Sequence, residues 1–339
     1  MVSSRLLVIR PGALGDVLVT LPALQSYRRG YPAASIELLG NPAVIRWLPG
    51  RSVVSSVESF DRADLARLVL PDGLTDATLI QYLGSFDHIL NYAVPGGHPL
   101  AQNLERVCRA RVYHLDTRSV AVITQHISDY LQHPLEALGL TPTTGWPELE
   151  PRPRDRQAAL EWQHAQGIGG RPVVAIHPGS GSPAKNWPAE RFAMVAQRLV
   201  QDKGVDVMLI SGPADDDTIR AVVGKTGDNR TTHLHQPDLG MLAAMLATCA
   251  AYLGNDSGVT HLAAAAGTET LALFGPTDPR IWAPRGSHVT VLSGCASCAP
   301  CLPEERRFCR MRHCLDDLSV DQVVLALYGA LNSALARRG

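Results

Sequence analysis

Short apolar runs alternate with longer amphipathic stretches along the whole chain. Several of the short runs are almost entirely apolar, which is typical of strands buried on both faces of a parallel sheet. The longer stretches repeat apolar residues at helical spacing. This alternation predicts an α/β, doubly wound architecture. The predicted strands are 6–9, 36–39, 53–57, 88–92, 173–177, 207–211, 252–254, 270–274 and 289–292, and the predicted helices include 18–29, 154–166, 189–203, 239–249 and 261–266.

A proline-rich segment between Thr141 and Pro172 interrupts the alternation. A similar opening stands on either side of it, "LLVIRPGALGDVLVTLPAL" before and "VVAIHPGSGSPAKNWPAERFAMVAQRL" after. Each opening reads as a strand, a basic residue or histidine, Pro-Gly, a loop of small residues and a helix. A chain of 339 residues is long enough for two domains of about 150 residues each. We therefore predict two Rossmann-like domains that face each other across a cleft, with the ligand at the carboxyl ends of the strands.

The domain boundaries follow from this pattern. We place the first domain at residues 1–150, a linker with a helical stretch at 151–170, and the second domain at 171–318. The last segment, 319–339, begins with the capping-box pattern "SVDQ" and continues with helical periodicity. We expect this C-terminal helix to pack across the boundary between the two domains.

Composition narrows the class of partner. The chain is 45% hydrophobic and 19% charged, with a net charge of −1, so no electrostatic case for nucleic-acid binding exists. No targeting segment and no run of about 18 apolar residues is visible, so we predict no membrane span and a cytoplasmic location. Seven cysteines, an odd number, argue against a disulfide framework.

The segment "VVAIHPGSGSPAKNW" opens the second half with a strand and a loop of small residues. It matches neither a Walker loop nor a dinucleotide fingerprint, because Lys185 is preceded by Ala184 rather than by glycine. Ser180 and Gly181 can still present a hydroxyl and backbone amides, and Lys185 can supply a point charge. These groups suit a diphosphate. The alternative is a tight turn with a solvated lysine.

The segment "YLGNDSGVTHLAAAAG" places a helix start directly after a strand. Asp256 or Ser257 would cap this helix, and the backbone amides from Gly258 onwards would favour an anion. The alternative is capping alone. His261, in the same helix, is by itself more typical of a structural histidine than of a catalyst.

The segment "RPGALGDVLVTLPAL" follows the first strand. Gly12 and Gly15 permit a sharp turn, and Asp16 falls at the junction of the strand with the following helix. Asp16 has two interpretations from its position alone. It either caps the helix or acts as a general base that faces the cleft.

Five of the seven cysteines lie close together near the C-terminus. Four of them have the spacing of a structural zinc site, namely Cys298, Cys301, Cys309 and Cys314. The alternative is that these are loop thiols with a packing role and no metal.

Together these stretches resemble glycosyltransferase family 9, the ADP-heptose:lipopolysaccharide heptosyltransferases. The resemblance rests on "GALGDVLVTLPAL", "HPGSGSPAKNWP", "GNDSGVTHLAAAAG", "LFGPTDPRIWAP" and the cysteine-rich tail, which occur in the family's order over nearly the whole chain. It implies a GT-B fold of two Rossmann-like domains. It also implies an inverting transfer that uses no cofactor and no metal. The acceptor side lies in the first domain and the nucleotide-sugar in the second.

The resemblance also implies roles for individual residues. Asp16 matches the family's proposed base, with Gly12 and Gly15 in the acceptor-side loop. Asp215 is the nearest candidate for the acidic residue that binds the nucleotide ribose. The other positions that match the family's donor-binding residues are Ser180, Gly181, Lys185, Asp256, Ser257, Gly258 and His261.

The expected partners are a nucleotide-diphosphate sugar, most simply ADP-heptose, and a lipid-linked saccharide acceptor. Such an acceptor would imply peripheral contact with the inner face of the cytoplasmic membrane. Two alternatives stay open at this point. A nucleotide-sugar epimerase can have the same fold, and so can a non-catalytic protein that binds a nucleotide-sugar.

Overall fold

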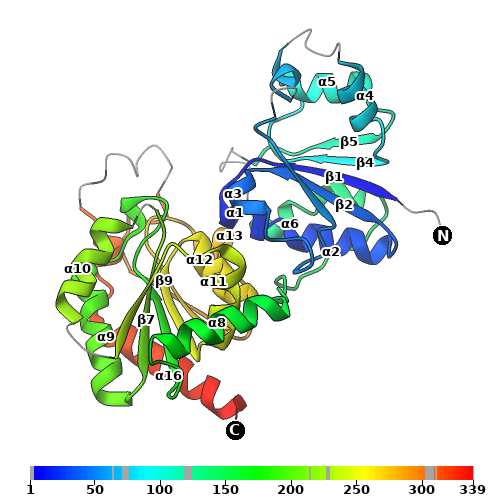
Figure 1. The fold of residues 1–339 in the computed structure, drawn as a ribbon. Coiled ribbons are helices and arrows are strands. Elements are labelled where there is room, and N and C mark those ends of the chain that lie inside the picture. The colour runs from blue at the N-terminus through cyan, green and yellow to red at the C-terminus, as the bar shows by residue number, and fades with distance from the viewer. Residues whose placement is uncertain are drawn as a thin grey trace. The chain divides into compact units, whose positions relative to one another are not determined.

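The computed structural model describes residues 4–62, 65–70, 76–117, 124–213, 215–226, 230–301, 309 and 311–338. The chain divides into two compact units, Met1–Pro147 and Glu148–Gly339. Each unit is built on its own parallel sheet (Figure 1). Across these described residues, no helix is long and apolar enough to span a membrane.

The first unit is a five-stranded parallel sheet. Its strands are β1 (Arg5–Arg10), β2 (Ser35–Gly40), β3 (Ser56–Ser59), β4 (His88–Asn91) and β5 (Arg111–His114). Their order is β3-β2-β1-β4-β5, which is the order of a Rossmann half. The direction of winding reverses between β1 and β4, which pair in register from Leu6 opposite His88 to Ile9 opposite Asn91. Ligands of doubly wound folds bind beyond the carboxyl ends of the strands at such a reversal.

The helices of the first unit are short. They are α1 (Leu14–Leu18), α2 (Leu21–Gly30), α3 (Pro42–Ile45), η1 (Leu65–Val69), α4 (Ala77–Leu83), α5 (Pro99–Val107), α6 (Ile127–Tyr130) and α7 (His133–Glu136). The single helix predicted at 18–29 is wrong at its start, because the chain makes α1 and then restarts as α2. Pro22 stands near the start of α2, where its missing amide proton is tolerated, but it would interrupt a continuous helix.

The second unit is a six-stranded parallel sheet. Its strands are β6 (Val173–His177), β7 (Asp206–Ser211), β8 (Thr231–His235), β9 (Ala251–Asn255), β10 (Glu269–Phe274) and β11 (Val289–Ser293). The order β11-β10-β9-β6-β7-β8 is again that of a Rossmann fold, with the reversal between β6 and β9. Strands β6, β7, β9 and β10 are buried along their whole length, as their apolar sequences predict.

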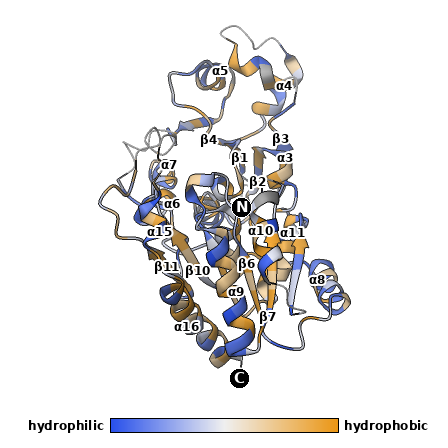
Figure 2. Cartoon of the chain, turned by 90° about the vertical axis from the view of Figure 1, so that its left-hand side faces the viewer, coloured by the Kyte–Doolittle hydropathy of each residue, from blue (hydrophilic) through white to orange (hydrophobic). Residues whose placement is uncertain are grey.

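Helices cover both faces of this sheet (Figure 1). They are α8 (Pro153–Ala165), η3 (Pro183–Lys185), α9 (Ala189–Lys203), α10 (Asp216–Thr226), α11 (Leu239–Thr248), α12 (Gly258–Ala265), α13 (Pro279–Trp282), α15 (His313–Asp316) and α16 (Val320–Arg338). Helix α9 turns apolar residues towards the strands and polar residues outwards (Figure 2). Helices α9 and α16 share one apolar core with the sheet.

The structure places the linker helix and the C-terminal helix inside the second unit. Helix α8, predicted as part of a linker, packs against α11. Helix α16 packs against α9, β9, β10 and β11, where Val323, Leu327 and Leu331 are buried. The packing described for α16 is therefore that of a covering helix on the second sheet, and the predicted packing across the boundary between the domains stays a prediction.

Candidate functional site

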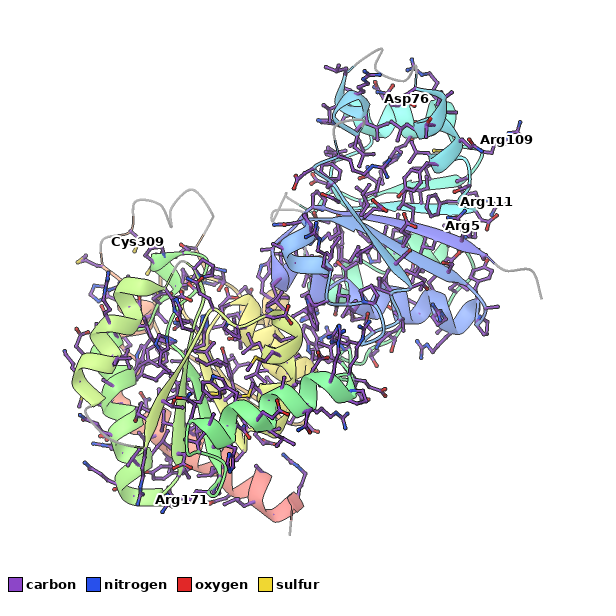
Figure 3. All side chains as sticks on the ribbon, viewed as in Figure 1. Arg5, Asp76, Arg109, Arg111, Arg171 and Cys309 are labelled. Carbon is purple, nitrogen blue, oxygen red and sulfur yellow. The ribbon has the colours of Figure 1, made fainter. Side chains whose placement is uncertain are left out.

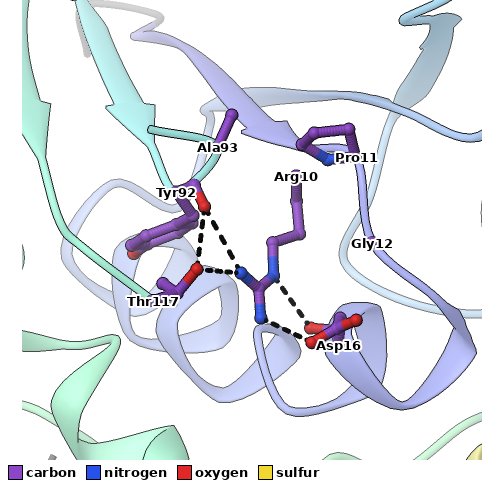
Figure 4. Close-up of a pocket in the computed structure, with 7 residues that line it drawn as sticks. All are labelled: Arg10, Pro11, Gly12, Asp16, Tyr92, Ala93 and Thr117. Atoms are coloured by element: carbon purple, nitrogen blue, oxygen red, sulfur yellow. Dashed lines mark hydrogen bonds and ion pairs between the residues drawn. The ribbon is translucent and has the colours of Figure 1, made fainter. Parts of the chain in front are cut away.

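The first unit has a pocket where β1 and β4 end, at the reversal of winding. It has a volume of about 290 Å³ and is lined by Arg10, Pro11, Gly12, Asp16, Tyr92, Ala93 and Thr117 (Figure 4). Arg10 is the last residue of β1, and Asp16 lies in the first turn of α1. The topology alone therefore brings a buried cation and a carboxylate to one edge of the sheet.

Both carboxylate oxygens of Asp16 accept a hydrogen bond. Arg10 Nη2 donates to Oδ1 over 3.0 Å, and the Ala13 amide donates to Oδ2 over 3.0 Å. A Cβ on Gly12 would lie 2.5 Å from the Cβ of Asp16, so glycine is needed there for this side-chain position. The side chain of Asp16 nevertheless stays 38% exposed. Asp16 is thus a fixed and accessible carboxylate.

Arg10 is held from several directions. Its Nη1 donates to the Thr117 hydroxyl over 2.8 Å and to the Tyr92 carbonyl over 3.4 Å, and its Nε donates to the Asp16 carbonyl over 3.3 Å. Burial lowers the pKa of Arg10, while the nearby Asp16 acts in the opposite direction. A guanidinium remains protonated in proteins, so the pocket contains a permanent positive charge.

In the second unit, the loop between β6 and α9 is anchored by a single amide on the neighbouring strand. Asn255 ends β9, and its Oδ1 accepts from the Trp187 amide over 2.9 Å. Its Nδ2 donates to the carbonyl of Pro178 over 2.8 Å. One buried side chain therefore holds both ends of the loop that contains Ser180, Gly181 and Lys185.

Lys185 and Asp256 meet at the same edge of the sheet. Lys185 Nζ lies 2.7 Å from Asp256 Oδ2, and the Thr277 hydroxyl donates to that same oxygen over 2.7 Å. The side chain of Asp256 is 7% exposed and that of Lys185 is 24% exposed. An ammonium group has three protons to donate, so Lys185 can hold Asp256 and still bind an anion.

Ser257 is the N-cap of α12. Its Oγ accepts from the Thr260 amide over 3.4 Å, so the capping prediction is confirmed for Ser257. Gly258 begins the helix, and the backbone amides of the first turn follow Asp256 closely in sequence. His261 is buried in the same helix. The second unit therefore combines a helix start and a lysine, two features that favour bound phosphate.

Asp215, the candidate for ribose binding, forms hydrogen bonds within the second unit. It is buried, and its Oδ2 lies 3.0 Å from His177 Nε2 and accepts from the Gly212 amide over 2.7 Å. Burial raises the pKa of Asp215, but the hydrogen bonds from His177 and Gly212 outweigh it, and the net pKa is lowered. Oδ2 of the carboxylate is thus bound within the protein, and the ribose role of Asp215 stays a prediction.

In the same loop, Ser180 is half-buried and Gly181 is exposed. Ser180 Oγ lies 2.7 Å from the Ser182 carbonyl and 2.6 Å from Asn186 Oδ1. A Cβ on Gly181 would meet nothing within 4 Å. The hydroxyl is therefore oriented by the loop itself, and the backbone at Gly181 is open.

The cysteines near the C-terminus are free thiols. Cys314 is buried, and its pKa is raised to about 11 by burial and by the neighbouring thiols Cys301, Cys298 and Cys309. Cys309 lies at the surface of the second unit (Figure 3). Within the described part of the chain, no three His, Cys, Asp or Glu side chains are placed to hold a metal ion.

Sequence reasoning missed several residues of both sites. Arg10, His177 and Asn255 are strand-end residues, while Thr277 lies just after β10. Their partners are on other strands or loops, up to 107 residues away in the case of Arg10 and Thr117. Their position at the carboxyl ends of predicted strands was the one available signal, and it does not identify the partner.

Comparisons with known proteins agree on one family. A family model described as glycosyltransferase family 9 (heptosyltransferase) matches residues 108–312, more than half of the chain. The chain is 26% identical to lipopolysaccharide heptosyltransferase 1 of Pseudomonas aeruginosa, over 88% of this chain and 86% of that protein. It is 31% identical to lipooligosaccharide heptosyltransferase 2 of Haemophilus influenzae, but that match spans only 37% of each protein.

Solved structures share the fold. The glycosyl transferase family 9 protein from Veillonella parvula superposes with a TM-score of 0.82 at 24% identity, covering 98% of this chain and 99% of that one. ADP-heptose LPS heptosyltransferase II of E. coli superposes with a TM-score of 0.75 at 20% identity, covering 97% and 99%. These likenesses confirm the predicted pair of Rossmann-like units, which is the GT-B fold.

Proposed function

The chain belongs to glycosyltransferase family 9, and from this premise we propose that it transfers a heptose from ADP-heptose to a lipid-linked saccharide of the lipopolysaccharide-core type. The relatives at hand are named as lipopolysaccharide or lipooligosaccharide heptosyltransferases. One structural neighbour is named for ADP-heptose. The donor, the acceptor and peripheral contact with a membrane are proposals for this chain.

The second unit supplies the groups that a departing nucleoside diphosphate needs. As the bond to the anomeric carbon breaks, negative charge grows on the diphosphate. Lys185 can take part of that charge while it stays bound to Asp256. The Ser180 hydroxyl, the open backbone at Gly181 and the first turn of α12 at Ser257–Gly258 can take more. Because these groups stabilise the leaving group, we propose a transfer without a metal ion.

The first unit supplies the base. An inverting transfer is a single displacement, in which the acceptor hydroxyl loses its proton as it attacks the anomeric carbon. The transition state has oxocarbenium character, as in glycoside hydrolysis. Asp16 is accessible and fixed at both oxygens, and a carboxylate has about four acceptor positions, so each oxygen can still accept a proton. We assign proton removal to Asp16 and orientation of the donor sugar hydroxyls to Asp256.

One observation supports this proposal above the others. Each unit carries a functional group just beyond the strand ends at its own reversal of winding. The first unit has the exposed carboxylate of Asp16 there, and the second has Lys185, with a helix start. A base and a phosphate-binding cation are the two groups that a metal-free sugar transfer requires.

Two substitutions test the division of roles. We expect Asp16→Asn to lower turnover by about 10²–10⁴-fold, with ADP affinity unchanged by calorimetry. We expect Lys185→Met to weaken ADP binding by roughly 10–100-fold, since a charge-assisted hydrogen bond contributes about 1.5–3 kcal/mol. Lys225→Met is the matched control, because Lys225 pairs with Glu190 on the surface. It should leave ADP affinity within about twofold.

Other outcomes would contradict the proposal. If Asp16→Asn keeps wild-type turnover, Asp16 is not the base. Conversion of ADP-heptose without any acceptor would identify an epimerase instead. A thermal-shift screen of ADP, UDP, GDP and CDP tests the donor, because a bound nucleotide raises the melting temperature. No response to any of the four would remove the basis for a nucleotide-sugar enzyme.

A further inference from the structure

The pocket of the first unit contains a buried arginine, Arg10, that donates two hydrogen bonds to Asp16. We propose that Arg10 is a positioning residue for sugar transfer, which holds the Asp16 carboxylate in the orientation that accepts the proton of the acceptor. This inference rests on the proposed function, since it takes Asp16 as the base. It adds a residue to which the sequence analysis assigned no role.

The contacts of Arg10 support this role. Its three nitrogens are directed at protein atoms, and two of them bond to Asp16, one to the carboxylate and one to the carbonyl. The third bonds to Thr117 and Tyr92 (Figure 4). Arg10 itself is only 4% exposed. It is therefore placed to orient Asp16 rather than to bind the acceptor directly.

The geometry requires a planar guanidinium. Thr117 and Tyr92 anchor Nη1 on one side, and this fixes the plane in which Nη2 and Nε meet Asp16. A lysine has a single charged nitrogen and cannot bridge these partners in one plane. The Ala13 amide holds only the other oxygen, Oδ2. Without Arg10, the carboxylate would be free to rotate about that remaining contact.

Kinetics of single variants give the first test. We expect Arg10→Met to lower kcat by roughly 10–100-fold, because a displacement of about 1 Å near the reaction can cost 10²-fold. The KM for ADP-heptose should stay within about twofold. Arg10→Lys should recover part of kcat, since the charge is kept and the planar contact is lost. If the KM for ADP-heptose rises while kcat falls, or if Arg10→Lys recovers no kcat, Arg10 has only a structural role.

The double variant separates positioning from an independent effect. If Arg10 acts only through Asp16, Arg10→Met combined with Asp16→Asn is no slower than Asp16→Asn alone. Losses that multiply would overturn the proposal. If Asp16→Asn itself turns over like the wild type, the proposed function has failed instead, and the two failures are thereby distinguished.

A milder variant covers the case in which Arg10→Met does not fold. Thr117→Val removes one anchor of the guanidinium and leaves Arg10 in place. We expect it to lower kcat several-fold in the wild-type background and to have no effect in the Asp16→Asn background. A kcat equal to that of the wild type would overturn the proposal.

Discussion

At the scale of single residues, each unit pairs the last residue of its first strand with an aspartate, and the two aspartates differ in accessibility. The first strand of each sheet ends in a basic residue or histidine followed by Pro-Gly, at Arg10 and at His177. Each of these residues contacts an aspartate over 3.0 Å, Asp16 and Asp215. The side chain of Asp16 is 38% exposed and that of Asp215 is 6% exposed. The first unit therefore presents an accessible carboxylate, Asp16, whereas the carboxylate of Asp215 in the second unit is buried against His177.

The buried His177–Asp215 pair predicts that alanine substitutions at two glycines of one loop differ in their effect on stability. A Cβ on Gly179 would lie 1.8 Å from Asp215 Oδ1, whereas a Cβ on Gly181 would meet nothing within 4 Å. We expect Gly179→Ala to lower the free energy of unfolding by about 1–3 kcal/mol, as overpacking does. Gly181→Ala should change it by less than about 0.5 kcal/mol. Urea unfolding measures both free energies, and equal decreases for the two variants would contradict the close packing of Gly179 against Asp215.

The residue scale also shows which parts of the site were readable from sequence. Asp16, Lys185 and Ser257 stand inside local motifs, and the structure brings Lys185 to Asp256 over 2.7 Å. Thr277 and Asn255 could not be assigned, because their contacts join segments far apart in the chain. The contact of Asp215 with His177 could not be assigned for a related reason, and the ribose role of Asp215 stays a prediction.

At the scale of elements, the buried strands were predicted well, whereas two of the four edge strands were missed. The prediction of 173–177 is confirmed to the residue, and 270–274 differs by one position. Strands β5 and β8 were missed. Both are edge strands, with the sequences RVYH and TTHLH, and are less buried than the central ones. Edge strands contact one neighbour only, so burial leaves a weaker pattern in their sequence.

The C-terminal helix offers a matched pair of leucines. In α16, Leu327 is fully buried in the core shared with α9 and the sheet, and Leu325 is 74% exposed. We expect Leu327→Ala to lower the free energy of unfolding by about 2–5 kcal/mol, through lost contacts and a cavity. Leu325→Ala should stay within about 0.5 kcal/mol of the wild type. Similar values for both would mean that α16 does not pack on this sheet in solution.

Helix α12 has a cap with two expected functions. Ser257 caps α12, and Asp76 caps α4 in the first unit through the amides of Thr78 and Leu79. Replacing either with alanine should cost about 1 kcal/mol of stability. Only Ser257→Ala should also weaken ADP binding, measured by calorimetry, because only that helix start belongs to the proposed phosphate site. Unchanged ADP affinity in Ser257→Ala would remove α12 from that site.

At the scale of the whole molecule, the fold followed from repetition. Two halves with the same opening predicted two Rossmann-like units, and both sheets show that strand order. The repetition does not reveal on which of the two sheets the segments outside the repeated halves pack. Helices α8 and α16 carry ordinary amphipathic patterns, and only their contacts place them on the second sheet. Each unit has its own apolar core, one centred on β1 and α5 and the other on β6, α9 and α16.

Because each unit has its own core and its own functional groups, bound nucleotide should protect backbone amides in one unit only. Backbone amides exchange with solvent through local opening, and a bound ligand suppresses opening where it makes contacts. We expect saturating ADP to slow exchange at residues 178–187 and at the start of α12, both in the second unit. The amides of the Asp16 pocket, including Ala13, should exchange as before.

Hydrogen exchange read by mass spectrometry resolves these segments, and Lys185→Met should reduce the protection at the same ADP concentration. Protection confined to the first unit would reverse the proposed roles, because the nucleotide would then lie beside Asp16 and Arg10 rather than beside Lys185.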